Sequence, residues 1–410
     1  MPKRLSNYAF VLAMSALGIL VIAWLGFYDV AWNDYDDEAR PAIDALIQGH
    51  VLSFLTAAPA YGGSLILRAP FALVPGLWGG GPVAVYRMVS LPCLLVAAGV
   101  GIVIVGQMRG LHRSRLARGA LLALFVANPI TIRAGEIGHP EDLLSAGLAI
   151  AAVLVAMRGR SGWAGLLLGL AIANKEWALV AVGPVLLALP AGRVRAIAIS
   201  GGVVAVVLAP LVLAGGGFTG QLRAAASVSA ASPIFQPWQV WWFLGTHGHA
   251  VYGLFGAPKP GYRVGVGWAI TLSHPLIVLI GAPLTFLAAR GRRREYDALL
   301  LLALLLLLRA ELDVWDTVYY ALPFILALAA WEALTHDRPP VGALAATALS
   351  WVVFVWAPVH LSADQQSLLF LAAALPATCS LAFSLYSPGS VRRRTLTGSP
   401  VRGSLAPRAG

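Results

Sequence analysis

Long apolar runs separated by short polar segments dominate this chain. A hydrocarbon core of ~30 Å takes about 20 helical residues to cross, and counting apolar runs predicts about twelve crossings. The sequence therefore predicts an all-α integral membrane protein with long loops on one side. The expected spans are 8–27, 84–107, 117–132, 143–157, 163–174, 176–190, 196–214, 266–288, 298–308, 317–334, 341–358 and 366–386.

Two segments do not fit a simple crossing. The stretch 64–78 is short and interrupted by Pro and Gly, so we expect a helix that lies at the outer surface or dips back into the membrane. The end of the chain, 387–410, is rich in Ser, Pro, Gly and Arg and predicts a disordered tail. The expected organisation is one transmembrane domain, 1–386, followed by that tail.

Composition agrees with the pattern: 59% of the residues are hydrophobic, 11% are charged, and the mean hydropathy is +0.78. No soluble domain has this composition. The two cysteines, Cys93 and Cys379, both fall in expected spans and predict inert packing residues. The spacing His247-Gly-His249 resembles a metal-binding pair, but no carboxylate or thiolate partner is assigned to it, so a divalent metal stays open and no cofactor is identified.

Basic residues predict the orientation. Of the 29 Lys and Arg residues, 20 fall in the two termini and in alternate connections between spans, where only four of the 18 acidic residues lie. Because Lys and Arg mark cytoplasmic segments, both termini are expected in the cytoplasm, in a plasma membrane. The net charge of +11 then reflects topology and attraction to anionic membrane lipids, and it does not imply nucleic acid.

The first expected outer loop, 28–63, concentrates acidic residues. Asp34, Asp36, Asp37 and Glu38 lie within five positions, followed by Arg40. Clustered like charges need water or cations, so this segment is either a solvated helix start or a set of carboxylates that does chemistry at the membrane surface. The residues after it, 39–49, have the spacing of a short amphipathic helix on the outer surface.

Further charges fall on the same expected side. The second loop contains Arg133, Glu136, His139, Glu141 and Asp142, of which the last two also suit an ordinary helix start. The fourth loop contains Arg309, Asp313, Trp315, Asp316 and Tyr319.

Lys175 stands apart because it lies between two short apolar segments, far from any expected cytoplasmic loop. A charge at that depth is costly unless it is paired or hydrated, which marks it as a candidate functional residue. The alternative is a structural pair between Lys175 and Glu176 or another carboxylate.

Three stretches resemble the GT-C superfamily of glycosyltransferases that use polyprenyl-phosphate sugars, in particular its bacterial mannosyl- and arabinosyltransferase branch. They are Asp36-Asp37-Glu38-Ala39-Arg40 with the segment to Gly49, Gly138-His139-Pro140-Glu141-Asp142-Leu143-Leu144 with Ala164 to Lys175, and Tyr319-Tyr320-Ala-Leu-Pro323. Together they cover most of the membrane core.

The resemblance implies an enzyme that moves a sugar, of mannose or arabinose type, from a polyprenyl-phosphate donor to a hydroxyl of a lipid or polysaccharide acceptor on the outer face, with inversion. It implies a first-loop Asp as the base, for which Asp37 matches best and Asp36 and Asp34 compete. Negative charge develops on the leaving phosphate, and the candidates to bind it are Lys175, Arg133, His139 and Arg309. The remaining candidates, for substrate binding, are Glu38, Arg40, Glu136, Glu141, Asp142, Asp313, Trp315, Asp316 and Tyr319.

The rival hypothesis is a polytopic transporter or flippase of a lipid-linked or polar solute. Twelve spans suit it equally well. However, transporters often show repeated halves and charges at mid-membrane depth, whereas no self-similar halves are visible here and the acidic residues collect in the expected outer loops.

Overall fold

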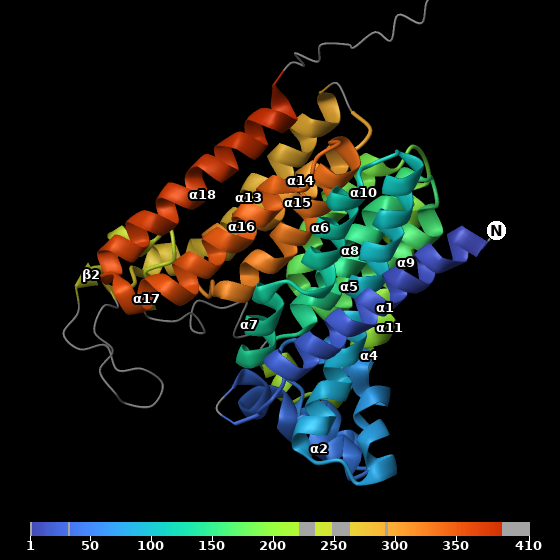
Figure 1. The fold of residues 1–410 in the computed structure, drawn as a ribbon. Coiled ribbons are helices and arrows are strands. Elements are labelled where there is room, and N and C mark those ends of the chain that lie inside the picture. Colours follow the sequence, from blue (N-terminus) through green and yellow to red (C-terminus); the bar gives the residue numbers. More distant parts are fainter. Residues whose placement is uncertain (1, 32, 221–233, 248–262, 292–293, 388–410) are drawn as a thin grey trace, which may run out of the picture.

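The computed structural model describes residues 2–31, 33–220, 234–247, 263–291 and 294–387 (Figure 1). These parts of the chain are almost entirely helical, as the apolar pattern predicts. The longer helices are α1 (Pro2–Gly26), α5 (Pro82–Gly110), α6 (Arg115–Val126), α8 (Glu141–Met157), α9 (Ser161–Asn174), α11 (Arg193–Ala214), α13 (Gly267–Arg290), α14 (Asp297–Leu312), α15 (Ala321–Thr335), α16 (Val341–Trp351) and α18 (Ala363–Tyr386).

Every expected span coincides with helix, but in the described part of the chain only eight helical segments are long and apolar enough to cross a membrane. The expected spans at 143–157, 163–174 and 298–308 correspond to α8, α9 and α14, which have 17, 14 and 16 residues. The span expected at 176–190 consists of a 3₁₀ turn, η3 (Glu176–Ala181), and the short α10 (Val182–Ala188). At 1.5 Å per residue, 14 residues extend only about 21 Å, so these four shorter segments are not among the eight candidate crossings.

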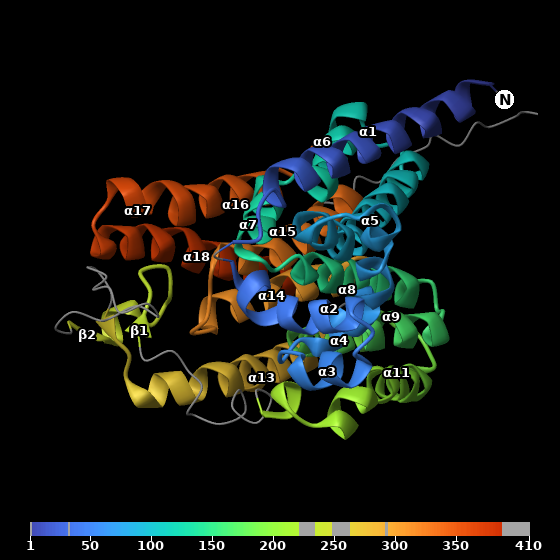
Figure 2. The same cartoon turned by 90° about the horizontal axis from the view of Figure 1, so that it is seen from below.

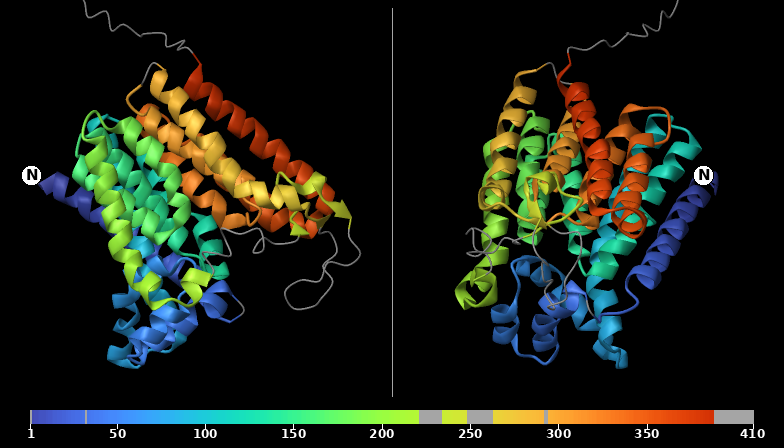
Figure 3. Two further views of the ribbon diagram at one scale, coloured as in Figure 1. Left: turned by 180° about the vertical axis from the view of Figure 1, so that it is seen from behind. Right: turned by 90° about the vertical axis from the view of Figure 1, so that its left-hand side faces the viewer.

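The inner and outer helices of the bundle differ in burial. Side chains of α8, α14 and α15 are buried on nearly all sides, which suits their uniformly apolar sequences. The outer helices leave large apolar side chains uncovered, among them Trp24, Leu213 and Phe383. Helices α11 and α13 lie on the outside of the bundle (Figure 3). These uncovered faces suit contact with membrane lipid.

The segment expected as a long first loop is largely helical. It contains the π-helical turn η1 (Tyr35–Ala39), α2 (Arg40–Ile47) and α3 (Val51–Ala57), which lie across one end of the bundle (Figure 2). The amphipathic prediction for 39–49 is confirmed in part: Ile43 is fully buried, whereas Ile47 at the end of α2 is exposed.

The segment 64–78, expected to lie at the outer surface or to dip back into the membrane, is helical and packs inside the bundle. Helix α4 (Gly62–Ala72) is followed by the 3₁₀ turn η2 (Val74–Trp78). The first turn of α4 is packed so closely that a Cβ on Gly63 would lie 2.0 Å from the carbonyl oxygen of Ala173. As a result α4 is inserted among α5, α9 and α11 instead of lying on the surface.

The connection between α11 and α13 contains a small antiparallel sheet of order β1-β3-β2, formed by β1 (Ile234–Phe235), β2 (Thr246–His247) and β3 (Arg263–Val264). His249 and the tail after residue 387 lie outside the described residues. Among the described residues, Cys93 is buried and Cys379 is exposed on its helix, and both are free thiols.

A candidate site of linked charges

The turn between α7 (Pro129–Ile137) and α8 brings the first and second loops together. Gly138 adopts φ +111, a left-handed conformation that favours glycine. A Cβ at this position would lie 2.4 Å from the backbone nitrogen of Tyr35. The close crossing of these two segments places the next residue, His139, against Asp34.

A carboxylate, an imidazole and a second carboxylate are joined in a row at this crossing. Asp34 Oδ2 lies 2.9 Å from His139 Nε2, and Glu141 Oε1 lies 2.7 Å from His139 Nδ1. His139 and Glu141 are buried, whereas the Asp34 side chain is 48% exposed. Asp34 is therefore the solvent-facing end of a network whose other members are inside the protein.

Lys175 extends the network inward. It lies where α9 ends, on extended backbone that separates α9 from η3. Its Nζ lies 3.2 Å from Glu141 Oε1 and 3.6 Å from Asp142 Oδ2, and 4.4 Å from the centre of the Tyr61 ring. This is the structural pairing with a carboxylate that the sequence left open, although its partners are Glu141 and Asp142 and not the exposed Glu176.

Neighbouring helices hold the two carboxylates of α8 in place. Arg68 of α4, 1% exposed, lies 3.3 Å from Glu141 Oε2. Trp177 Nε1 donates to Asp142 Oδ1 at 2.8 Å. The Asn174 amide donates to the backbone carbonyl of Glu141 at 2.8 Å. Buried charges of this kind persist because each one is met by a partner of opposite sign or by a hydrogen bond.

Arg309 of α14 links Asp142 to a further carboxylate. The nearest carboxylate oxygens are Asp142 Oδ1 and Asp313 Oδ2, both at 4.0 Å. The Tyr320 ring centre lies 3.7 Å from its guanidinium carbon. Arg309 is buried, and its Nε and Nη1 atoms have no hydrogen-bond partner among the described residues. Asp313 Oδ1 also lies 3.2 Å from His274 Nε2. The row of linked side chains therefore runs from Asp34 to His274.

Electrostatics favour the protonated form of His139. Burial by itself lowers the pKa of this imidazole, but the charge of Glu141 and the hydrogen bonds to Asp34 and Glu141 outweigh it and raise the pKa to about 9. An imidazolium donates from both ring nitrogens. At neutral pH His139 therefore donates one hydrogen bond to each carboxylate and holds Asp34 in a defined position.

The other acidic residues of the first loop are arranged differently. Asp36 pairs with Arg40 at 2.5 Å, and Arg40 also reaches Asp44 at 3.4 Å. Asp37 and Glu38 are exposed. Glu38 nevertheless lies beside the network: burial raises its pKa, and His139, a hydrogen bond with Tyr61 and the charge of Lys175 oppose that shift. Asp37 has no ion pair among the described residues, so it is a solvated residue on the outer side of η1.

The other candidate site residues of the second and fourth loops differ in whether they contact the network. Arg133 and Glu136 form an ion pair with each other within α7. Tyr319 belongs with the network, because its ring centre lies 4.7 Å from that of His139. Trp315 is exposed, and Asp316 is buried but faces a different cavity.

Several members of the network were not identified from the sequence. Arg68 carries the same signal as Lys175, because it is an isolated cation within an apolar segment. Tyr61, Asn174, Trp177 and His274 have no such signal, because an amide or an aromatic residue near a helix end is common in any membrane protein. Their involvement depends on packing that the linear sequence does not display.

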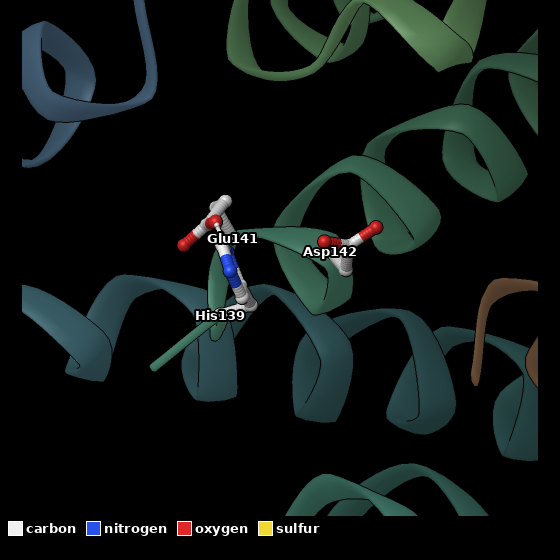
Figure 4. Close-up of side chains that lie close together, drawn as sticks. All are labelled: His139, Glu141 and Asp142. Atoms are coloured by element: carbon white, nitrogen blue, oxygen red, sulfur yellow. Dashed lines mark hydrogen bonds and ion pairs between the residues drawn. The ribbon is translucent and has the colours of Figure 1, made fainter. Parts of the chain in front are cut away.

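Three residues of the network also have the composition of a metal site. Ligand atoms of His139, Glu141 and Asp142 lie within 4.8 Å of one another. Figure 4 shows His139 beside Glu141, with Asp142 on the first turn of α8. The surroundings do not fit a cation, because the Lys175 ammonium already bridges the two carboxylates and would repel a second positive charge. We therefore assign no metal to these residues.

Comparison of the chain with models of known protein families finds no match. A search of curated proteins also finds no similar sequence.

Proposed function

We propose that this chain is a membrane glycosyltransferase of the GT-C type, which transfers a sugar from a polyprenyl-phosphate donor to a hydroxyl of a lipid or polysaccharide acceptor. The observation that carries the proposal is the row Asp34–His139–Glu141, at the end of the bundle that the first-loop helices cover. It offers one accessible carboxylate, held rigidly, next to a group of buried cations.

Asp34 is the residue we propose as the base, in place of the Asp37 favoured by the resemblance. Its side chain is half exposed, and only Oδ2 is engaged by His139, which leaves Oδ1 for an acceptor hydroxyl. Asp37, by contrast, has no partner in the described chain that would orient it. A base must come within about 3 Å of the proton it removes, so orientation matters more than proximity to the loop tip.

The proposed reaction is a single displacement. The acceptor oxygen attacks the anomeric carbon and the carbon–oxygen bond to the phosphate breaks. The hydroxyl proton moves to Asp34, and the lipid phosphate leaves with the bonding electron pair. Attack from the face opposite the phosphate inverts the anomeric centre. The phosphate needs no proton but needs cations, because negative charge accumulates on it.

Arg309 is the first choice for the phosphate ligand. Its Nε and Nη1 donors have no hydrogen-bond partner among the described residues, and its carboxylate neighbours are 4.0 Å away. Lys175 is the second choice, since its charge is already shared between Glu141 and Asp142. In this scheme Lys175 mainly positions the carboxylates, while Arg309 meets the charge that develops during transfer.

The proposal also requires an orientation. We propose that the Asp34 end of the bundle faces outward from the plasma membrane, that both termini are cytoplasmic, and that α8, α9, α10 and α14 complete a twelve-segment membrane domain between the longer spans. A cysteine introduced at the exposed Ser53 of α3 should react with an impermeant maleimide added to intact cells. Reaction only after the membrane is opened would place the Asp34 end of the bundle in the cytoplasm, which would contradict the proposed catalytic scheme.

The decisive experiment measures sugar transfer from a synthetic polyprenyl-phosphate sugar by purified protein. Asp34→Asn keeps the shape and removes the proton acceptor, so we expect transfer to fall by roughly 10²–10⁴ while donor binding survives. Asp37→Asn is the matched control and should retain transfer, because Asp37 is an exposed residue of η1 only three positions after Asp34. Loss of sugar transfer in Asp37→Asn alone would identify Asp37 as the base, as the resemblance implies. Full activity in both variants would refute a catalytic first loop.

One observation favours a transporter instead. The charges between Asp34 and His274 form a continuous buried row, and rows of intramembrane ionisable residues are typical of proton or ion pathways. Proteoliposomes distinguish the two functions. Transport of a lipid-linked or polar solute that depends on a proton gradient, without sugar transfer, would favour the transporter.

A further inference from the structure

A second feature lies away from the row of charges. A cavity of about 430 Å³ is lined mainly by α14, α15, α16 and α18. Its apolar lining includes Leu307, Phe324, Leu328, Leu349, Val353 and Phe370. The cavity follows α15, whose 15 residues extend about 22 Å. The volume is in the range of ligand sites, roughly 300–1,000 Å³, and the elongated apolar lining suits a hydrocarbon chain.

Small residues create this space. Helix α16 contributes Ala345 and Ala346 to the lining, and α18 contributes Ala373, Ala374 and Ala377. In membranes, small residues usually allow two helices to approach each other closely. Here they line a cavity wide enough to admit a chain between the helices.

Two arginines lie at one end of the cavity. Arg338 lines that end, is exposed, and forms no ion pair with any residue that the structure describes. His336 lines the same end and is half-buried. A second arginine, Arg294, donates from Nη1 to the carbonyl of the lining residue Ser384 at 3.4 Å. An anionic group at this mouth would meet two guanidinium groups.

The nearby carboxylate does not cancel these charges. Both oxygens of Glu332 accept backbone hydrogen bonds at the start of α16, from Gly342 and Ala343 at 2.9 Å each. Its charge is therefore directed at the helix N-terminus, where it is favourable. Asp337 is similarly occupied by its ion pair with Arg113.

The opposite end of the cavity is acidic. Glu311 is buried there and accepts a hydrogen bond from Thr378 Oγ1 at 2.6 Å. Asp316 is also buried, and its Oδ1 has no hydrogen-bond partner among the described residues. Burial raises the pKa of Asp316 well above its usual range, so this end is largely uncharged and supplies no cation. The arginines at the other end therefore define one direction for an anionic amphiphile.

We propose that this cavity binds an anionic phospholipid, with one acyl chain between α15, α16 and α18 and the phosphate against Arg338 and Arg294. The inference does not depend on the proposed glycosyl transfer. The phosphate of the sugar donor would belong near Arg309, at the other end of the bundle from Arg338.

Native mass spectrometry of the purified protein in detergent tests this proposal, with phosphatidylglycerol and phosphatidylcholine of the same chain length titrated separately. We expect one tightly retained phosphatidylglycerol and weaker retention of phosphatidylcholine. Arg338→Ala should weaken phosphatidylglycerol binding about fivefold, the effect of one surface cation on an anionic lipid, and should leave phosphatidylcholine binding unchanged. Arg193→Ala, at an exposed arginine of α11 outside the cavity lining, is the charge control and should have no effect.

Ala374→Phe fills the cavity without changing any charge. It should abolish retention of both lipids, and circular dichroism with size-exclusion chromatography would establish that the variant is folded. Should it misfold, Ala346→Leu on the facing helix serves the same purpose. Unchanged lipid retention in a folded, filled variant would overturn the proposal, as would equal losses in Arg338→Ala and Arg193→Ala. A polyprenyl phosphate that binds in competition with phosphatidylglycerol, sensitive to Ala374→Phe but not to Arg338→Ala, would instead identify the cavity as a site for the donor chain.

Discussion

Glu141 is the most connected member of the charge network, and its removal should be costly. Its carboxylate meets His139 at 2.7 Å, Lys175 at 3.2 Å and Arg68 at 3.3 Å, and the residue is fully buried. In Glu141→Gln the amide keeps the volume but removes the negative charge. Three cationic groups then lose their common partner inside the protein.

The expected magnitude follows from the burial of these partners. Removing one member of a buried ion pair typically costs about 3–5 kcal/mol, because the remaining charge is left uncompensated. Asp142 still faces Lys175 at 3.6 Å, which limits the loss on that side. We expect Glu141→Gln to lower the free energy of unfolding by ~3 kcal/mol, measured by thermal or denaturant unfolding in detergent micelles.

A control and a double variant sharpen the measurement. Glu176→Gln removes a carboxylate next to Lys175 in sequence, but Glu176 is exposed and should change stability by less than about 0.5 kcal/mol. Lys175→Met in the Glu141→Gln background removes one uncompensated cation, so the double variant should be more stable than the sum of the single effects predicts. Strict additivity, or equal effects of Glu141→Gln and Glu176→Gln, would refute the role of Glu141 as the centre of the network.

Two other predictions concern the crossing of the first and second loops. Because the pKa of His139 is raised from 6.5 to about 9 in the folded protein, its stabilising contribution is fully present below about pH 6.5 and is lost as the pH rises through about 9. Unfolding measured from pH 6 to pH 10 should show this loss in the wild type and not in His139→Gln; an identical pH profile in both would exclude His139 as the group responsible. Gly138→Ala should destabilise the protein by about 1–3 kcal/mol, because φ is +111 and the new Cβ would meet Tyr35. Gly99→Ala in α5, where a Cβ meets nothing within 4 Å, should be neutral or stabilising, and equal effects at the two glycines would contradict the close crossing.

The membrane character and the helical segments are determined by the sequence alone. Apolar runs must satisfy their backbone hydrogen bonds internally when they are surrounded by lipid, so a run of this composition becomes a helix whatever its neighbours are. The positions of the helices were therefore predictable, within a few residues at their ends. Isolated charges such as Lys175 were also identifiable, because a lone cation in an apolar segment needs a partner somewhere in the fold.

The lengths of the helices and the depth of α4 were less predictable. Composition alone does not show that α9 stops at Asn174 so that Lys175 can leave the helix on extended backbone. It also does not show that glycines such as Gly63 allow α4 to enter the bundle. Both features depend on contacts with neighbouring helices. These contacts offset the helical hydrogen bonds that are lost where a helix ends early.

Only the tertiary structure decided which charges meet. Asp34 and His139 are 105 residues apart, and Arg68 and Glu141 are 73 apart, so no local pattern connects them. Four acidic residues lie within 34–38, yet among the described residues only Asp34 forms an ion pair with the buried network, while Asp37 remains in solvent. The difference comes from the sharp turn at Gly138, which lets the backbone at Tyr35 pass close enough for His139 to reach a single carboxylate.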